Sequence, residues 1–318
     1  MLTFLAHSDN FMRYCTYGLT FESLQRLGIN MKNRQEDMPV LNKNSAKQCR
    51  SPKRIGARKT SEIPASILEQ LNKGEIETAN LVEWLAVDQA ILLNHLLTKH
   101  DRTAYLKPIL NEINQLKKRT VNTINEAIGI GLLEQITQQN DIVFFQTISL
   151  HPADLVRCWA AYTVGKNKDL SISETLDQIQ QFAADPHFGV REISWLVVRE
   201  KISSNLQESI SILTEWATNS DENIRRFASE AIRPRGVWCA HIDALKQNPA
   251  IALSILEALK SDPSRYVQNS VANWLNDAAK TCPLFVKELC TRWERESKSK
   301  ETMYIVKRAI RNLNKDNK

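Results

Sequence analysis

The sequence contains few glycines and prolines and no paired-cysteine motif. Only 9 Gly and 10 Pro occur in 318 residues, so hairpins and dinucleotide-binding folds have few sites for their turns. The six cysteines form no C-x-x-C pair and several lie within helical apolar patterns, which is typical of reduced thiols in a cytoplasmic protein. The six histidines are equally scattered. We therefore expect neither a metal site nor a cofactor.

Long apolar runs and a strong charge bias are also missing. No run reaches membrane-spanning length, and the first thirty residues lack the basic-then-apolar layout of a signal peptide. The net charge of +6 fits a polyanionic partner, but many ordinary proteins have a similar charge. A chain of this length forms either one solenoid or two ordinary domains.

The first 62 residues differ from the rest in composition and periodicity. Residues 1–30 show no sustained period, and we interpret them as an upstream extension, with natural translation starting at Met31. Residues 31–62 form a basic polar arm that contains Lys43, Lys47, Arg50, Lys53, Arg54, Arg58 and Lys59. Such an arm is either an inert leader or a segment that lies along phosphates and adds salt-sensitive affinity.

From Ile63 onward the apolar residues follow a helical period. One stripe ends at Gly74, which we predict to be a helix C-cap, and the next helix is predicted to start at Thr78 and to run through TANLVEWLAVDQAILLNHLL. Helical patterns follow near 103–118, 121–137 and 141–150. The segment IVFFQTI at 142–148 also has a strand pattern, but no partner strand exists elsewhere. CPLFVKELCTRWERES and KETMYIVKRAIRNL are predicted to be the last helix pair.

Four related segments lie between residues 151 and 280. Each opens with a turn signal and then places an apolar residue before a polar one, at Val156-Arg157, Val190-Arg191, Ile224-Arg225 and Val267-Gln268. The polar members are 34, 34 and 43 residues apart. Such a period is typical of HEAT or armadillo helix pairs, which stack because one pair cannot bury its apolar face alone. We predict an all-α solenoid of HEAT-like helix pairs over residues 63–318, with a concave face.

Three acids step along these repeats. Counted from the polar members of the repeats, Glu192 is at +1, Glu230 at +5 and Asp277 at +9. Steps of four keep the side chains near one helical face, so the acids should form a diagonal on one surface. Each acid also has a structural interpretation as an ion pair or turn contact, with candidate partners Arg191 or Arg225 for Glu192, and Arg226 or Arg233 for Glu230.

The same segments carry basic and aromatic residues. The basic residues able to neutralise phosphates are Arg191, Arg199, Arg226, Arg233, Arg235 and Lys280. Carboxylates on such a surface would repel phosphates unless they face a cation. An alkylated purine is cationic, and cleavage of its N-glycosidic bond builds oxocarbenium character that carboxylates stabilise. Trp195, Trp238 and Trp274 are candidate contacts to the cationic base or its sugar.

The stretches HFGVREISWLVVRE, IRRFASEAIRPRGVWCAHI and YVQNSVANWLNDAAK resemble the AlkC branch of the DNA alkylation repair glycosylases, relatives of AlkD with HEAT-like repeats. The resemblance covers residues 62–314. It implies a monofunctional glycosylase that removes cationic lesions, chiefly 3-methyladenine and also 3-methylcytosine, from duplex DNA without flipping the base into a deep pocket. We count 7-methylguanine as a further candidate substrate. The family's acids match Glu192, Glu230 and Asp277. Some AlkC proteins carry a C-terminal immunoglobulin-like domain, which we do not expect here because no strand-rich segment precedes Lys318.

These observations lead to one set of expectations. Asp277 and Glu230 stabilise the sugar cation and position water, Glu192 assists, and the catalytic repeats span about 151–296. The partner is double-stranded DNA with alkylated bases. The protein is expected to be a cytoplasmic monomer, associated with the nucleoid when bound to DNA. The alternatives are a DNA-binding scaffold without catalysis and a HEAT-type protein-interaction module, in which the acids form only ion pairs between repeats.

Overall fold

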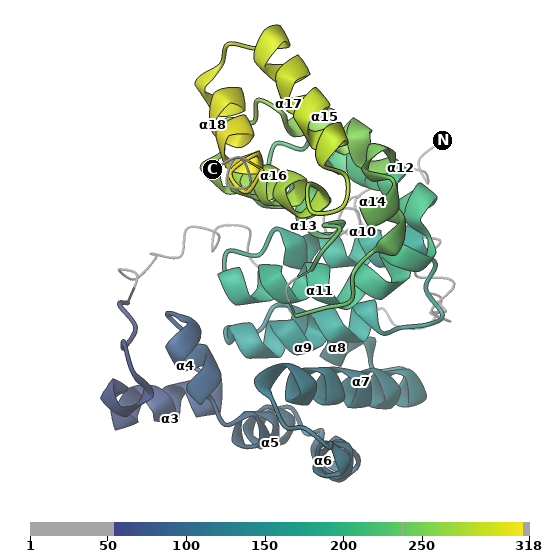
Figure 1. Ribbon diagram of the computed structural model, residues 1–318. Coiled ribbons are helices and arrows are strands. Elements are labelled where there is room, and N and C mark those ends of the chain that lie inside the picture. Colours follow the sequence, from purple (N-terminus) through teal and green to yellow (C-terminus); the bar gives the residue numbers. More distant parts are fainter. Residues whose placement is uncertain (1–53, 237, 314–318) are drawn as a thin grey trace, which may run out of the picture. The chain divides into compact units, whose positions relative to one another are not determined.

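The structure is a computed structural model that describes residues 54–236 and 238–313. By its internal contacts the chain divides into residues 1–55 and 56–318. The predicted upstream extension and residues 31–53 of the basic arm lie outside the described residues. Every regular element in the described part is a helix, which confirms the all-α prediction (Figure 1). No helix there has both the length and the apolar character that a membrane span needs.

Eight helices precede the repeats in the described part of the chain, and α7 is the longest of them at 19 residues. They are η2 (Thr60–Glu62), α3 (Ala65–Lys73), α4 (Leu81–Ala86), α5 (Gln89–Lys99), η3 (Thr103–Tyr105), α6 (Leu106–Gln115), α7 (Val121–Gln139) and α8 (Ile142–Ser149). The repeats and the last helix pair contain α9 (Asp154–Gly165), α10 (Ile172–Ala183), α11 (Phe188–Ser204), α12 (Leu206–Trp216), α13 (Glu222–Glu230), α14 (Asp243–Gln247), η4 (Pro249–Ala252), α15 (Leu253–Leu259), α16 (Arg265–Ala278), α17 (Pro283–Glu296) and α18 (Lys300–Ala309).

The predicted long helix from Thr78 is wrong, because two caps divide it. The Asn80 side chain accepts a hydrogen bond from the Glu83 amide and starts α4, and the Asp88 side chain accepts from two amides at the start of α5. Side-chain oxygens at these positions satisfy amides that the first helical turn leaves free. The predicted end of α3 is confirmed, since Gly74 caps that helix with a φ of 70°.

The repeats form two layers of stacked helices. In one layer α9 packs on α11, α11 on α13, α13 on α16 and α16 on α18; in the other α10 packs on α12 and α12 on α15 (Figure 1). Trp159, Trp274 and Trp293 are among the largest fully buried side chains. Each layer therefore buries the apolar face that one helix pair leaves exposed, which confirms the solenoid prediction.

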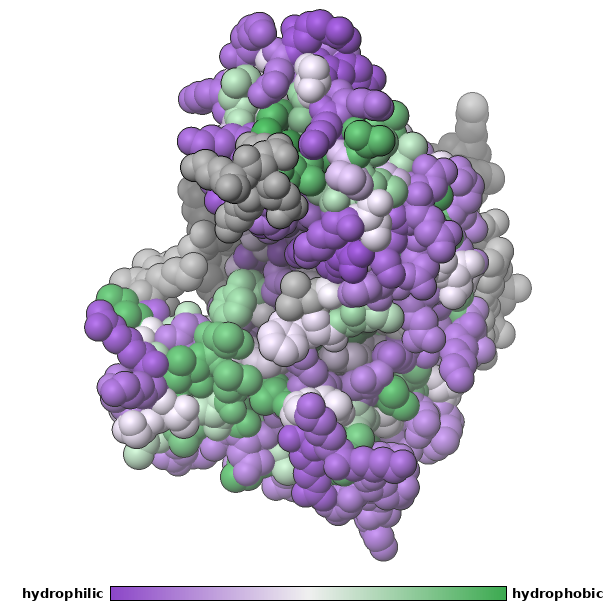
Figure 2. Space-filling model, in the orientation of Figure 1, coloured by the Kyte–Doolittle hydropathy of each residue, from purple (hydrophilic) through white to green (hydrophobic). Residues whose placement is uncertain are grey.

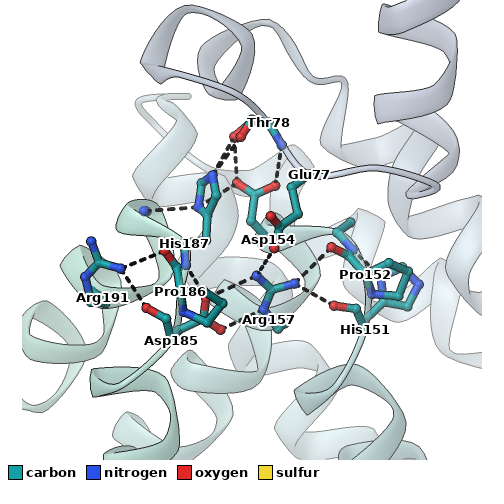
Figure 3. A network of polar contacts seen from close by, with 12 residues as sticks. Glu77, Thr78, His151, Pro152, Asp154, Arg157, Asp185, Pro186, His187 and Arg191 are labelled. Carbon is teal, nitrogen blue, oxygen red and sulfur yellow. Dashed lines mark hydrogen bonds and ion pairs between the residues drawn. The ribbon is translucent and has the colours of Figure 1, made fainter. Parts of the chain in front are cut away.

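The same turn opens each repeat, and its geometry explains why the sequence frame recurs. The first turn residue accepts a hydrogen bond from the amide two residues later, at His151, Asp185, Asn219 and Asp262. The polar residue of the frame then bonds back to the turn: Nη1 of Arg157, Arg191 and Arg225 each donates to the carbonyls six and five residues earlier, and Gln268 donates to the Asp262 carbonyl. Figure 3 shows two of these turns side by side.

A hydrophobic area covers α3 and α4 in the space-filling view (Figure 2). On α4 the exposed apolar side chains include Leu81 and Leu85, with exposed fractions of 56% and 53%. The purple areas elsewhere on this face are hydrophilic.

Candidate nucleic-acid interface and active site

A line of alternating charges crosses three helices of the first layer. Arg226 of α13 places its Nη2 2.7 Å from Oε1 of Glu192 on α11 and 3.6 Å from Oε2 of Glu230. Arg233 continues the line with Nη1 2.8 Å from Oε1 of Glu230 and Nη2 2.6 Å from Oδ2 of Asp277 on α16. The three predicted acids are thus linked through two arginines.

The line ends in solvent at Lys280. Its Nζ lies 3.0 Å from Oδ1 of Asp277, and its side chain is 50% exposed. Three acids and three bases therefore alternate in the order Glu192, Arg226, Glu230, Arg233, Asp277 and Lys280. Of the partners named from sequence, Arg226 and Arg233 do bind Glu230. The arginine that binds Glu192 is Arg226 and neither of the two expected ones.

The acids differ in their access to solvent. The Glu192 side chain is 43% exposed, whereas the side chains of Glu230 and Asp277 are 6% and 7% exposed. Burial raises the pKa of the Glu230 carboxyl, but the charges of Arg226 and Arg233, with hydrogen bonds from Arg233 and Ser270, outweigh it and lower that pKa below its usual value. The carboxylate at the centre of the line is therefore ionised at neutral pH.

A surface depression of about 360 Å³ lies over this line. Its lining residues are Glu192, Trp195, Arg226, Glu230, Arg233, Trp238, Tyr266, Asn269, Ser270 and Asn273. Two of the acids thus face the depression directly. Asp277 is not in its wall and contacts the wall through Arg233. The sequence placed Asp277 and Glu230 at the centre of the chemistry, but the structure gives the outermost position to Glu192.

Two of the predicted tryptophans border the depression. Trp195 is 8% exposed, and its Nε1 donates a hydrogen bond to Oε2 of Glu192 over 2.9 Å, which fixes that carboxylate from a second side. Trp238 is 91% exposed and has a φ of 69°. This left-handed backbone costs a non-glycine residue about 1–2 kcal/mol, and such strain concentrates at functional sites.

Two predicted site residues need correction because they are buried. Trp274 is 0% exposed, and its Nε1 donates to the Ile232 carbonyl over 3.0 Å, so it belongs to the core. Arg199 is 3% exposed and its guanidinium donates to the carbonyls of Ala231, Ala240 and Arg233. It holds the segment that carries Trp238 and does not reach a phosphate.

The remaining predicted phosphate contacts vary in availability. Arg226 and Arg233 are occupied by the acids described above. The Nε of Arg235 is buried without a hydrogen-bond partner among the described residues. Lys280 is half exposed beside Asp277. Arg191 is bound to its own turn through Nη1 only.

Tyr266 is a site residue that the sequence reasoning missed. Its ring lies beneath two guanidinium groups, 4.4 Å from Arg226 and 5.4 Å from Arg191, and it lines the depression. Such stacking favours the planar guanidinium over other cations. The sequence did contain a sign of this role. Tyr266 lies two residues before Gln268, and it is aromatic. The equivalent positions in the other three repeats are not aromatic: they are Leu155, Gly189 and Asn223.

Comparison with known proteins shows that this chain is similar in fold to solved structures. No protein-family profile matches the chain. The uncharacterized protein YhaZ of Bacillus subtilis is 39% identical over 120 residues, which are 38% of this chain and only 33% of that protein. AlkD2 from Streptococcus mutans aligns with 65% of this chain at 22% identity and a TM-score of 0.45.

The alkylpurine DNA glycosylase AlkC of Pseudomonas fluorescens, solved bound to DNA containing an abasic-site analog, aligns at a TM-score of 0.59 and 21% identity. The alignment covers 82% of this chain and 66% of AlkC. The chain therefore has the helical fold of AlkC.

Proposed function

We propose that this protein is a DNA glycosylase that removes cationic N-alkylated bases from duplex DNA by hydrolysis of the N-glycosidic bond. The observation that carries the proposal is the pair of carboxylates, Glu192 and Glu230, facing one depression with aromatic walls. Its support from comparison is the fold of AlkC, an alkylpurine DNA glycosylase solved with DNA.

The geometry suits stabilisation of a developing positive charge. As the base departs, the sugar gains oxocarbenium character, and a nearby carboxylate lowers the energy of that state. Glu192 is the acid that a bound strand reaches first, because its side chain is 43% exposed. A carboxylate in this place also orients an attacking water. The alkylated base is already a good leaving group, so a modest electrostatic contribution suffices.

Glu230 and Asp277 take different parts in this proposal. Glu230 is fixed in the wall of the depression by Ser270 and two arginines, and it adds negative potential where the sugar would lie. Asp277 is a positioning residue that holds Arg233, which in turn holds Glu230. Without Asp277 the Arg233 side chain would lose the partner that fixes its orientation.

The aromatic side chains supply the contact to the lesion. Trp238 is almost fully exposed at the rim, and its indole face attracts a cationic ring more strongly than a neutral base. Trp195 acts through Glu192, whose carboxylate it anchors. The proposed phosphate contacts are Lys280, which lies beside Asp277, and Arg235, which follows Arg233 by two residues.

One observation favours a second candidate, a DNA-binding scaffold without catalysis. Each of the three acids is already ion-paired with arginine, and two of them are buried. Ion pairs of this kind also hold repeats together without chemistry. The two candidates differ in one measurable property, the release of a base.

The test is a base-release assay on methylated duplex DNA, resolved into 3-methyladenine, 3-methylcytosine and 7-methylguanine. We expect release by the parent protein, and a rate lower by about 100-fold in Glu192→Gln and Glu230→Gln. Glu208→Gln on the exposed side of α12 is the matched control and should release bases at the parent rate. Duplex binding without base release by the parent would favour the scaffold. Equal rates in all variants would remove the acids from the chemistry.

A further inference from the structure

Arg191 differs from the equivalent arginines of the neighbouring repeats in what its outer edge contacts. Arg157 directs Nε and Nη2 to the Asp185 carboxylate at 2.7 and 3.1 Å, and Arg225 does the same to Asp262 at 2.6 and 3.1 Å. The same edge of Arg191 has no carboxylate partner among the described residues. The one hydrogen bond that this edge makes with the described residues is a long one, from Nε to the Tyr266 hydroxyl at 3.4 Å.

The cause is one residue in the next turn. Each repeat arginine reaches forward to the residue that opens the following turn, which is Asp185 after Arg157 and Asp262 after Arg225. After Arg191 that residue is Asn219. Its Oδ1 accepts from the Asp221 amide at 2.8 Å, which keeps the turn intact and leaves no charge for the arginine. Figure 3 shows the contrast, with Arg157 between Glu77 and Asp185 and Arg191 on backbone carbonyls.

The free edge lies beside the candidate site. Arg191 precedes Glu192, and its guanidinium stacks on the Tyr266 ring, which lines the depression. The neighbouring carboxylate does not neutralise it, because Glu192 is engaged by Arg226 and Trp195. The other side of the guanidinium is fixed, since Nη1 donates to the Asp185 and Pro186 carbonyls at 2.6 and 2.9 Å. The group is therefore oriented before any ligand arrives.

We propose that Arg191 is a preformed phosphate fork, which binds one backbone phosphate of the DNA through Nε and Nη2, and that Asn219 keeps this fork open. The Nε–Nη2 edge matches two phosphate oxygens in the way that it matches the two carboxylate oxygens in the neighbouring repeats. The proposal rests on the proposed function for the identity of the polyanion. It adds a specific contact to the DNA strand, made by Arg191. This contact depends on the one position where the repeat pattern differs, Asn219 in place of an aspartate.

The test compares the salt dependence of binding to unmodified duplex DNA. Asn219→Asp should close the fork with the missing ion pair, and Arg191→Gln should remove it. Each change should make the slope of log K against log salt shallower by about 0.9, the value of one phosphate contact. In the Arg191→Gln background, Asn219→Asp should change the slope no further, which separates capture of Arg191 from a general effect of the added charge.

Arg225→Gln is the matched control, because it removes an equivalent arginine that is already ion-paired. It should lower the stability and leave the slope unchanged. The proposal is overturned if Asn219→Asp keeps the parent slope, or if Arg225→Gln lowers the slope as much as Arg191→Gln. This measurement does not depend on base release, so it still tests the phosphate fork if the protein proves to have no catalytic activity. A parent protein that binds no duplex DNA would overturn both proposals.

Discussion

The hydroxyl of Ser270 donates a hydrogen bond to Oε2 of Glu230 over 2.7 Å and so connects α16 to α13. Both side chains are buried, at 2% and 5% exposure. With Arg233 bound to Oε1, both oxygens of the carboxylate have a partner. A charged group with this many fixed partners is held in one orientation, which is what electrostatic stabilisation of a reacting sugar requires.

Loss of the Glu230 charge should destabilise the fold. Glu230→Gln leaves Arg226 and Arg233 buried beside a neutral amide, and breaking a buried pair in this way costs about 3 kcal/mol. Glu192→Gln should cost less than about 1 kcal/mol, because that acid is half exposed. Urea denaturation of the two variants measures the difference. Equal midpoints would show that the inner ion pairs contribute no more than the outer one.

The stability should fall as the pH is lowered through the range of one buried histidine. Burial, together with nearby positive charges such as Lys99, lowers the pKa of His151 to about 4. In the unfolded chain its pKa is about 6.5, so between these values the unfolded state binds a proton that the folded state does not. Stability is therefore lost with falling pH over this window, by about 3 kcal/mol from this residue.

His151→Asn tests that prediction without breaking the turn. The Nδ1 of His151 accepts from the Ala153 amide, and Asn219 performs the same role in a later repeat with its side-chain oxygen. We expect the difference in stability between the variant and the parent to grow in favour of the variant as the pH falls from 6.5 to 4. A difference that stays constant with pH would show that His151 does not titrate in this way. Burial raises the pKa of Asp154, which has the opposite effect on stability in both proteins and cancels in the difference.

Replacement of Trp238 should separate stability from activity. Its φ of 69° is unfavourable for any side chain with a Cβ, and glycine adopts it freely. Trp238→Gly should therefore raise the stability by about 1 kcal/mol while slowing base release, and Trp238→Ala should slow release without the gain. Thermal denaturation and the base-release assay on both variants provide the two readouts. Base release at the parent rate by both variants would show that the Trp238 indole takes no part in the reaction.

Gly129 lies where α7 packs against α9. A Cβ there would lie 2.2 Å from Cβ of Tyr162, too close for the two helices to keep their spacing. Gly129→Ala should destabilise the fold by about 1–3 kcal/mol, although alanine favours a helix. Glu134→Ala, at an exposed position of the same helix, should change the stability by less than about 0.5 kcal/mol. Calorimetry of both proteins checks this, and an unfolding temperature at or above that of the parent in Gly129→Ala would contradict it.

The repeat frame was predictable because each repeat needs the same turn. Arg157, Arg191 and Arg225 recur at fixed spacing since each closes its turn through the same two carbonyls. The alignment of Glu192, Glu230 and Asp277 in one network followed from that frame.

Other features were beyond the reach of periodicity. Trp195 and Trp274 lie in equivalent helices of different repeats, but only contacts across the stack decide that one borders the surface and the other is in the core. Arg199 could not be recognised as a loop anchor, because its acceptors are carbonyls at positions 231, 233 and 240. Thr78 had the pattern of a helix start but instead bonds to Asp154 and His187, 76 and 109 residues further along the chain.

The strict alternation of acids and bases from Glu192 to Lys280 has a consequence for how a polyanion reaches this surface. Three negative and three positive groups cancel, so the line exerts little attraction at distances beyond a few ångströms. Long-range attraction of a polyanion must therefore come from charges elsewhere on the protein. The line itself interacts only with groups in direct contact with it. In the proposed function, the rate of encounter with DNA is then governed by ionic strength, and the choice of nucleotide by close-range complementarity.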